Sequence, residues 1–300
     1  MSLWNRYLLP VSIEEALLAL RNAPGPACLV AGGTDLLIEL QQGRHDPVDT
    51  LVDISRIPEL TCLEVRGDDL FIGAAVPVSQ LAESPLVRRH AEALAEACGL
   101  IGGPQVRNAA TLGGNVAHAL PAADGMIALA ALDAKAEIAS EDGKSFSLRR
   151  APLFSLFLGP GQSALARDRA LLVGFYLPLR RPGEGSAFLR VMRPQGVALP
   201  ILNLAVWLAR AGDRIVDVRL AAGPAGPTPR RAVDVEEVLR GAVFSQQTME
   251  QARRIWHETV SFRSSLRRAS AEYRHHLSND LLEAGLERAW LRAVHSLDEV

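Results

Sequence analysis

Two glycine-rich segments carry the residue types best suited to chemistry in this sequence. The first is 31–35, AGGTD, and the second is 101–124, which contains the pairs Gly102-Gly103 and Gly113-Gly114. Paired glycines allow a positive φ and let a ligand approach main-chain N–H groups closely. Both segments are therefore candidates for binding an anion, above all the diphosphate of a nucleotide cofactor. Each segment alone is also compatible with an ordinary tight turn, and the glycine fingerprints of the Rossmann fold and of the P-loop are both absent.

Two polar side chains in the second segment have more than one interpretation. Asp124 stands at the start of an apolar run, where it is either a helix cap or a hydrogen-bond acceptor for ligand hydroxyls. His118 is either a wall residue of the site, which we favour, or a covalent tether for a flavin.

The elements that position the first segment are readable from its flanks. CLVA at 28–31 is a short apolar run typical of a buried strand, and LLIEL at 36–40 predicts a helix directly after the glycines. Strand, glycine turn and helix together present free N–H groups to a phosphate. Upstream, Ser12 and Glu15 form a capping box for a first helix, and Ser84-Pro85 opens a later helix that we expect to end at Gly99.

The second half of the chain predicts a sheet followed by helices. Strands are expected at 186–192, 201–209 and 214–222, the last two in an antiparallel meander, and helices at 234–240, 246–260 and 270–294. This order is typical of the α+β class. The proline- and glycine-rich stretch 178–185 is the best linker candidate, so we divide the chain into domains 1–177 and 178–300.

Composition excludes several classes of protein. The net charge is −2, the pI is about 6.4 and aromatic residues make up 5% of the chain, which argues against nucleic-acid binding. The three cysteines are far apart, which favours the cytoplasm and excludes a disulfide framework, structural zinc or an iron–sulfur cluster held by this chain alone. No apolar run is long enough to span a membrane.

No catalytic constellation is visible. The nucleophile-elbow and zinc-protease motifs are missing, the seven histidines are scattered, and no acid/base pair stands out. We therefore assign no catalytic residue and no metal ligand. If the chain takes part in redox chemistry, that chemistry belongs to a bound cofactor.

The two glycine segments, taken together, resemble a known family. AGGTDLL at 31–37 and VRNAATLGGN at 106–115 are similar to the diphosphate-binding segments of the FAD-binding medium subunits of molybdenum hydroxylases, which include xanthine, carbon monoxide and aldehyde dehydrogenases. PAAD at 121–124, GPAGPTPR at 223–230 and SAEYR at 270–274 resemble further motifs of this family, so the resemblance covers nearly the whole chain. IGGPQVRN and RSSLRRASAEYR look closest to stand-alone bacterial xanthine dehydrogenase flavin subunits.

The resemblance implies a fold and a set of site residues. The fold is a two-subdomain FAD-binding fold of the vanillyl-alcohol-oxidase type, followed by a C-terminal α+β domain with an antiparallel sheet and helices. Asp124 would lie at the ribityl or ring side of a noncovalent FAD, Ile101 and Gly102 at the adenine, and Leu171 or its neighbour Leu172 beside the flavin. The diphosphate contacts would come from Gly32, Gly33, Thr34, Asp35, Leu36, Thr111, Gly113, Gly114 and Asn115.

The resemblance also implies partners and an electron path. A large partner subunit would hold the molybdopterin cofactor, and a small partner would pass electrons through two 2Fe–2S clusters to FAD on this chain. The acceptor would be NAD, quinone or oxygen; it stays open because the run 193–197 lacks the acidic residue that some xanthine dehydrogenases carry there. The alternatives to a xanthine dehydrogenase-like complex are a carbon monoxide or aldehyde dehydrogenase-type complex, a self-contained flavin oxidoreductase, or a scaffold without catalysis.

Overall fold

The structure is a computed structural model that describes residues 2–141, 146–193, 199–262, 264–265 and 269–294. The chain divides into two compact units. Unit 1 contains 1–80, 103–119 and 135–177, and unit 2 contains 81–102, 120–134 and 178–300. Residues 194–197 of the run 193–197, and residues 263 and 266–268 of the segment 263–274, lie outside the described residues.

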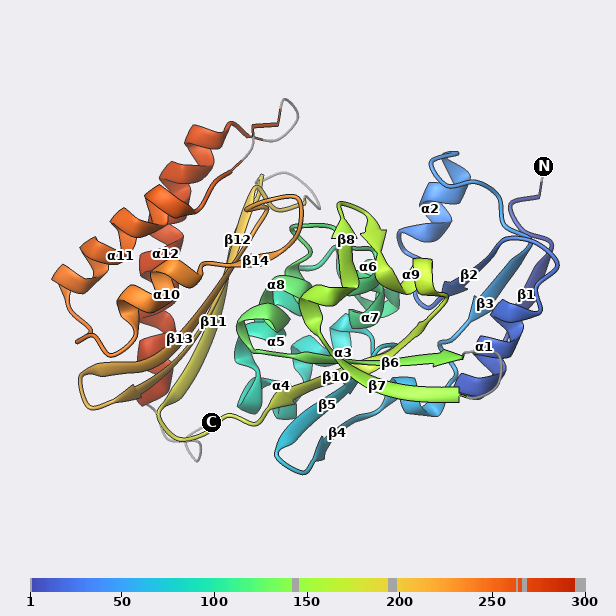
Figure 1. The fold of residues 1–300 in the computed structure, drawn as a ribbon, viewed down its shortest axis with the longest axis horizontal. Helices are drawn as coiled ribbons and strands as arrows, with labels where there is room; N and C mark the ends of the chain where they lie inside the picture. Colours follow the sequence, from blue (N-terminus) through green and yellow to red (C-terminus); the bar gives the residue numbers. More distant parts are fainter. Residues whose placement is uncertain (1, 142–145, 194–198, 263, 266–268, 295–300) are drawn as a thin grey trace. The chain divides into compact units, whose positions relative to one another are not determined.

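Unit 1 begins with a small parallel sheet in the order β1-β3-β2 (Figure 1). The helix α1 (Ile13–Arg21) packs against it, and the cap at Ser12 is confirmed, since Ser12 Oγ accepts from the Glu15 amide at 3.1 Å. The reciprocal bond of the capping box is shifted by one residue: Glu15 Oε2 accepts from the amide of Val11, at 2.9 Å, rather than from that of Ser12. The strand expected before the glycines is present as β2, and the helix after them as α2. The bounds are β1 (Arg6–Leu8), β2 (Ala27–Val30), β3 (Thr50–Asp53) and α2 (Leu36–Gln41).

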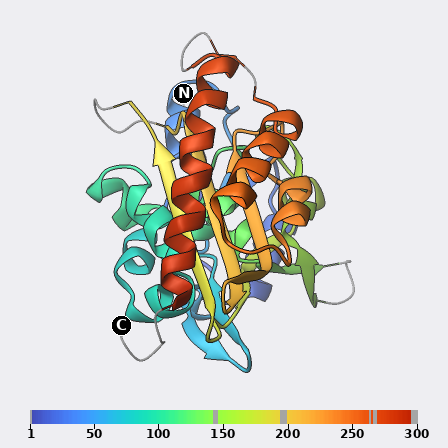
Figure 2. The ribbon, with the colours of Figure 1, turned by 90° about the vertical axis from the view of Figure 1, so that its left-hand side faces the viewer.

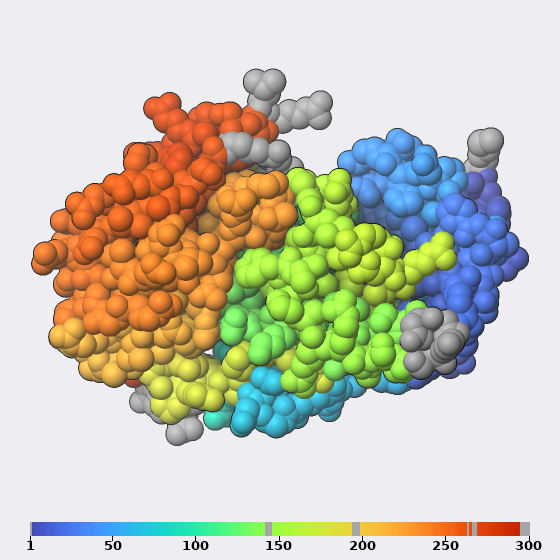
Figure 3. All heavy atoms as spheres, in the orientation of Figure 1, coloured from blue at the N-terminus to red at the C-terminus, as the bar shows by residue number. Residues whose placement is uncertain are grey.

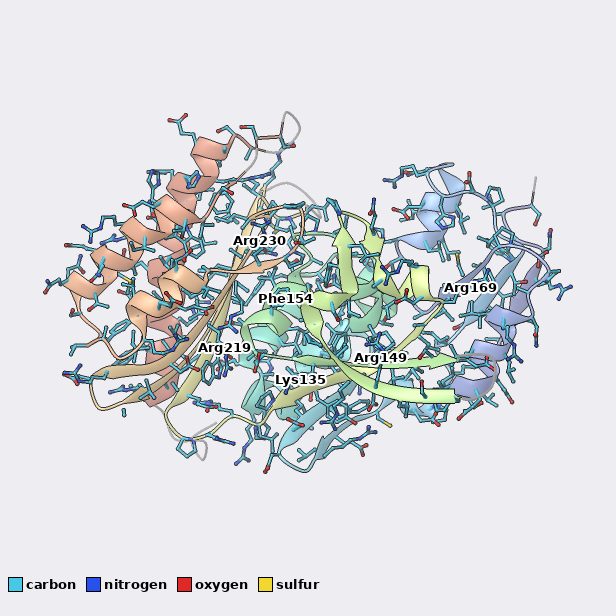
Figure 4. The ribbon with its side chains drawn as sticks, in the orientation of Figure 1. Lys135, Arg149, Phe154, Arg169, Arg219 and Arg230 are labelled. Atoms are coloured by element: carbon cyan, nitrogen blue, oxygen red, sulfur yellow. The ribbon has the colours of Figure 1, made fainter. Side chains whose placement is uncertain are left out.

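The second sheet of unit 1 has five strands in the order β4-β5-β10-β6-β7. Successive side chains of a strand point to opposite faces. On β7, for example, the guanidinium of Arg150 stacks over the Tyr176 ring at 3.5 Å. The preceding residue, Arg149, pairs with Ile138 in the register of β7 and β6, and it is labelled in Figure 4. The bounds are β4 (Leu63–Arg66), β5 (Asp69–Gly73), β6 (Lys135–Glu141), β7 (Phe146–Pro152) and β10 (Leu171–Pro178).

The remaining elements of unit 1 are short. They are η1 (Pro58–Thr61), α3 (Val78–Glu83, which crosses the unit boundary), α6 (Pro104–Ala109), α7 (Leu112–Ala117), η2 (Leu153–Leu156), β8 (Phe157–Gly159), β9 (Gln162–Ser163) and α9 (Ala164–Asp168).

Unit 2 is an antiparallel sheet with helices on both faces (Figures 1 and 2). The helix α12 runs along β11 and β12 on one face, with α10 and α11 beside it. The other face is covered by α5 (Glu92–Leu100) and α8 (Asp124–Ala131). Gly285 lets α12 approach the sheet, because a Cβ there would lie 2.9 Å from Val206. The predicted meander and the three C-terminal helices are confirmed. The bounds are β11 (Glu184–Val191), β12 (Leu202–Ala211), β13 (Arg214–Gly223), β14 (Arg230–Arg231), α10 (Val233–Leu239), α11 (Gln246–Thr259) and α12 (Ala271–Val294).

The single helix expected from Ser84 to Gly99 is wrong in two respects. Two helices occupy this region, α4 (Pro85–His90) and α5 (Glu92–Leu100), and Gly99 lies inside α5 while Ile101 is its C-cap. Ala91 breaks the helix with φ −144° and ψ 54°. The helix predicted from Asp124 is present as α8 (Asp124–Ala131). No helix of the described chain is long and apolar enough to cross a membrane.

Candidate functional site

The first glycine segment forms the turn between β2 and α2 in unit 1. Gly33 has a φ of +66°, which a residue with a side chain rarely adopts. Within the described residues, the amides of Gly33, Thr34, Asp35 and Leu36 donate no hydrogen bond. Asp35 is at the N-cap of α2, but its carboxylate does not cap the helix. The turn therefore offers unbonded N–H groups to an anion, as the sequence predicted.

The second glycine segment packs directly against the first. A Cβ on Gly32 would lie 1.9 Å from the carbonyl oxygen of Ala109, and a Cβ on Gly113 would lie 2.5 Å from the carbonyl oxygen of Ala74. Only a glycine at 32 allows the first segment to approach Ala109 this closely, and only a glycine at 113 allows the second segment to approach Ala74. The structure thus brings together two segments that are distant in sequence, as the two-segment hypothesis requires.

The amides of 112–115 in the second segment are already used inside the protein. Leu112 donates to Val76 O at 3.2 Å, Gly113 to Ala74 O at 2.9 Å and Asn115 to Thr111 O at 3.0 Å. The remaining amide, of Gly114, donates to Thr111 Oγ1 at 3.1 Å and caps α7. A contact from 112–115 to a diphosphate must therefore come from side chains rather than from these N–H groups.

Asn115 offers such a side chain. Its Oδ1 is buried and has no hydrogen-bond partner among the described residues. Because this oxygen only accepts, its partner in a ligand would be a hydroxyl or N–H group, whereas the Nδ2 group of the same side chain can donate to a diphosphate. Thr111 is buried as well, and its hydroxyl retains a hydrogen to donate.

Asp124 lies in unit 2, in the first turn of α8, and it does not cap the helix. Its carboxylate accepts from Arg190 Nη1 at 2.5 Å and from Asn203 Nδ2 at 2.6 Å. Both Asp124 and Arg190 are almost fully buried. Burial raises the pKa of Asp124 to about 6, although Arg190 and Asn203 act in the opposite direction. Asp124 is therefore a carboxyl group that changes charge near neutral pH.

Arg190 also connects Asp124 to the segment that contains Ile101 and Gly102. Its Nη1 donates to the carbonyl oxygen of Leu100 at 2.7 Å, directly before that segment. Arg190 thus binds both Asp124 and the residue directly before Ile101.

Arg190 and Asn203 were not among the predicted site residues. They lie directly opposite each other in the β11–β12 register, so both side chains reach the same face of the sheet. The sequence feature that could have identified them is Asn203 itself, a single polar residue inside the apolar run ILNLAVWL. A buried strand keeps such a residue only when it has a partner.

The structure also shows where Leu171 and His118 lie. Leu171 is completely buried in a core cluster of unit 1 that includes Val52 and Phe71. His118 ends α7, and its Nε2 lies 3.7 Å from Glu39 Oε1 on α2, so it stands close to the first helix of the site. Among the described residues no group of three potential metal ligands occurs, and the expectation of no metal site stays a prediction.

Comparison with known proteins defines the class of protein to which this fold and site belong. Residues 3–180 match the family described as the FAD binding domain in molybdopterin dehydrogenase, and residues 187–289 match the CO dehydrogenase flavoprotein C-terminal domain. The chain therefore belongs to the FAD-binding subunits of the molybdenum hydroxylases.

Individual relatives extend over nearly the whole chain. The medium subunit of nicotine 6-hydroxylase from Paenarthrobacter nicotinovorans is 34% identical, over 96% of this chain and 98% of its own. The xanthine dehydrogenase FAD-binding subunit of Escherichia coli O157:H7 is 33% identical over 93% of each chain. A chain of the carbon monoxide dehydrogenase of Hydrogenophaga pseudoflava superimposes with a TM-score of 0.88 at 29% identity, covering 96% of this chain and 97% of that one.

These relationships confirm the predicted family, fold class and cofactor. The chain is an oxidoreductase subunit whose cofactor is FAD, and the molybdopterin and iron–sulfur groups of such complexes belong to other subunits. The glycine turn with unbonded amides and the unpartnered Asn115 Oδ1 fit a nucleotide cofactor.

Proposed function

We propose that this chain is the FAD-binding electron-transfer subunit of a xanthine or purine dehydrogenase-like complex. It receives electrons from 2Fe–2S clusters on a small partner subunit and passes them to an external acceptor, which is NAD, quinone or oxygen. The large partner subunit holds the molybdopterin cofactor and oxidises the substrate. The observation that supports the proposal is the close approach of Gly32 to Ala109, which brings the two glycine segments together.

Each group of site residues has a physical role in this proposal. The amides of 33–36 act as fixed dipoles that stabilise the diphosphate without adding full charges near the flavin. Thr111 Oγ1 and Asn115 Nδ2 complete that contact as donors, and Asn115 Oδ1 accepts from a hydroxyl or N–H group of the cofactor. Asp124 and Arg190 bind the polar groups of the cofactor in unit 2. FAD, when bound, accepts and releases electrons, and the protein holds it and excludes competing reactions.

The direct test is the flavin content of the purified full-length chain. We expect noncovalent FAD with the usual flavin absorption, released intact on denaturation. Asn115→Ala should weaken FAD binding by about tenfold or more, since it removes a buried polar partner. Asn108→Ala, an exposed asparagine in the same region, should bind FAD normally. A chain that stays colourless and takes up no FAD on reconstitution contradicts the proposal.

The proposed substrate class requires the assembled complex. Co-expression with the neighbouring large and small subunit genes should give a three-subunit assembly whose flavin absorption is bleached by hypoxanthine or xanthine. Bleaching by carbon monoxide or an aldehyde, with no response to purines, would assign the chain to the alternative type of complex.

A self-contained flavin oxidoreductase remains the second candidate because of Asp124. A buried carboxyl with a pKa of about 6 is a suitable general acid or base. Turnover of a simple organic substrate by the isolated chain would favour this candidate, and absence of turnover together with activity in the complex would exclude it.

We also propose a cytoplasmic location and the domain division 1–177 and 178–300. The three cysteines are free thiols, which suits a reducing compartment. The division follows the linker at 178–185, although the compact units assign 81–102 and 120–134 to the C-terminal part.

A further inference from the structure

Cys28 and His45 form a pair in unit 1, apart from the residues assigned to FAD. Cys28 is half-buried on β2, and its Sγ lies 3.9 Å from Nε2 of His45 in the loop that follows α2. The other ring nitrogen, Nδ1, lies 2.7 Å from the carbonyl oxygen of Asp46. A carbonyl oxygen only accepts hydrogen bonds, so Nδ1 must carry the proton in the neutral ring. The lone pair of Nε2 then faces the thiol.

The other two cysteines provide a comparison inside the same chain. Cys62 is also half-buried, but its thiol donates to the carbonyl oxygen of Pro58 at 3.3 Å, and a carbonyl cannot take up its proton. Cys98 is completely buried, and burial raises the pKa of its thiol far above the usual range. Of the three, Cys28 has a base within reach.

The environment of Cys28 favours proton transfer at the moment of reaction. Burial raises the pKa of the Cys28 thiol, so the resting group is a thiol rather than a thiolate. Nucleophilic attack then depends on a base that removes the proton, and an imidazole at hydrogen-bonding distance is the usual base for a thiol. His45 and Cys28 are both half-buried rather than fully buried, and the segment that contains α2 and its following loop lies at the surface (light blue in Figure 3), so a small reagent can reach the pair.

We propose that Cys28 is a modification site for small electrophiles, hydrogen peroxide among them, with His45 as the base. The thiol proton passes to His45 Nε2 as sulfur attacks one peroxide oxygen. An S–O bond forms and the O–O bond breaks, and the hydroxide that leaves takes the proton from His45 as water. The sulfur is oxidised by two electrons to a sulfenic acid and the peroxide is reduced. With iodoacetamide, an S–C bond forms, iodide leaves, and the proton passes from His45 to water.

The test measures the rate at which each cysteine is modified in the purified full-length protein. Iodoacetamide is one probe, and hydrogen peroxide followed by dimedone is the other, with peptide mass spectrometry to separate the three cysteines. At neutral pH, Cys28 should react at least about tenfold faster than Cys62, as expected for assistance by a base. In urea, the rates should become equal.

The variant His45→Gln distinguishes a general base from a side chain that only shields Cys28 from the reagent. Loss of the base should slow Cys28 by about tenfold while Cys62 stays unchanged, whereas loss of a side chain that only covers Cys28 would make it react faster. His276→Gln, at an exposed histidine on α12 of unit 2, is the control and should leave the rate unaltered. The proposal is overturned if Cys28 reacts no faster than Cys62 in the native protein, or if His45→Gln leaves its rate unchanged or increases it.

Discussion

The pKa of the Asp124 carboxyl group is subject to opposing effects. Burial disfavours its charged form, while Arg190 and Asn203 favour it, and the result is a pKa raised from 3.8 to about 6. The folded protein therefore keeps this proton at a pH where the unfolded chain has lost it. The contribution of Asp124 to stability decreases as pH rises from about 4 to about 6, and it is constant above that range.

This pH dependence can be tested with Asp124→Asn, which cannot ionise. The difference in unfolding free energy between the native protein and the variant should decrease by up to about 3 kcal/mol from pH 4 to pH 7, because the pKa differs by about two units between the folded and unfolded states. Urea unfolding at a series of pH values, at equal flavin occupancy, measures this difference. Parallel pH profiles for the two proteins would contradict the raised pKa.

Gly32 makes a sharp prediction about backbone packing. Gly32→Ala places a Cβ 1.9 Å from the Ala109 carbonyl oxygen, so the two glycine segments must separate. We expect a loss of about 2 kcal/mol or more in stability and loss of bound FAD. Gly99→Ala is the matched control, since its Cβ would meet Ala82 at 3.8 Å inside a helix and should be neutral or slightly stabilising. Thermal unfolding and flavin content report both effects.

At the scale of elements, one carboxylate connects three parts of unit 2. Glu96 on α5 binds Arg292 on α12 through two hydrogen bonds of 2.7 and 3.1 Å, and its Oε2 accepts from the Phe188 amide on β11 at 2.8 Å. Arg292 also donates to the carbonyl oxygen of Ser186 at 2.8 Å. This network fixes helices that lie on opposite faces of the same sheet.

A double-mutant cycle measures this connection. Glu96→Gln keeps an oxygen for the Phe188 amide but removes the charge, and Arg292→Gln removes its partner. We expect a coupling energy of about 1 kcal/mol or more, because the pair is partly buried and makes two bonds. The exposed pair Arg167 and Asp168 is the control and should show no measurable coupling. Additive effects at Glu96 and Arg292 would contradict the role of the network.

The elements that were predictable from sequence are those whose signals are local. The cap at Ser12 and the apolar periodicity of the C-terminal strands and helices depend on neighbouring residues, and the structure has them within a few positions. The helices α6 and α7 were not predicted, because each has six residues and is held by contacts with Ala74, Val76 and Val78 rather than by its own propensity. The break at Ala91 has no signal in the sequence that we can identify.

The candidate site was likewise predictable only where its sequence signals are local. Glycine pairs identify a backbone that needs close approach or a positive φ, so Gly32, Gly33 and Gly113 were visible in the sequence. Arg190 reaches Asp124 across 66 positions through the register of two strands, and register is not readable from one sequence. The hydrogen bonds that occupy the amides of Leu112 and Gly113 likewise depend on the residues that follow β5, far upstream in the sequence.

At the scale of the whole molecule, the chain enters unit 2 three times. Residues 81–102 and 120–134 supply α5 and α8, which cover one face of the sheet formed by β11, β12 and β13. Cutting the chain at the predicted domain boundary would therefore remove the helices that cover one face of that sheet.

This arrangement predicts the behaviour of a fragment. Residues 178–300 alone should be poorly soluble or unfolded, because Phe188, Arg190 and Asn203 lose their partners and an apolar sheet face meets water. Size-exclusion chromatography and circular dichroism measure this. As control, the full chain cleaved at an inserted protease site near Gly183 should stay associated. A monomeric, cooperatively folded fragment would show that the C-terminal domain is independent after all.

The contact between Gly32 and Ala109 also sets an order of events during synthesis. The turn at 31–35 leaves the ribosome early, yet the backbone that packs against it is made 77 residues later. Contacts so distant in sequence form only after the intervening chain has closed. A nascent chain shorter than this cannot present a finished binding element, so cofactor loading must follow, rather than guide, the folding of the first hundred residues.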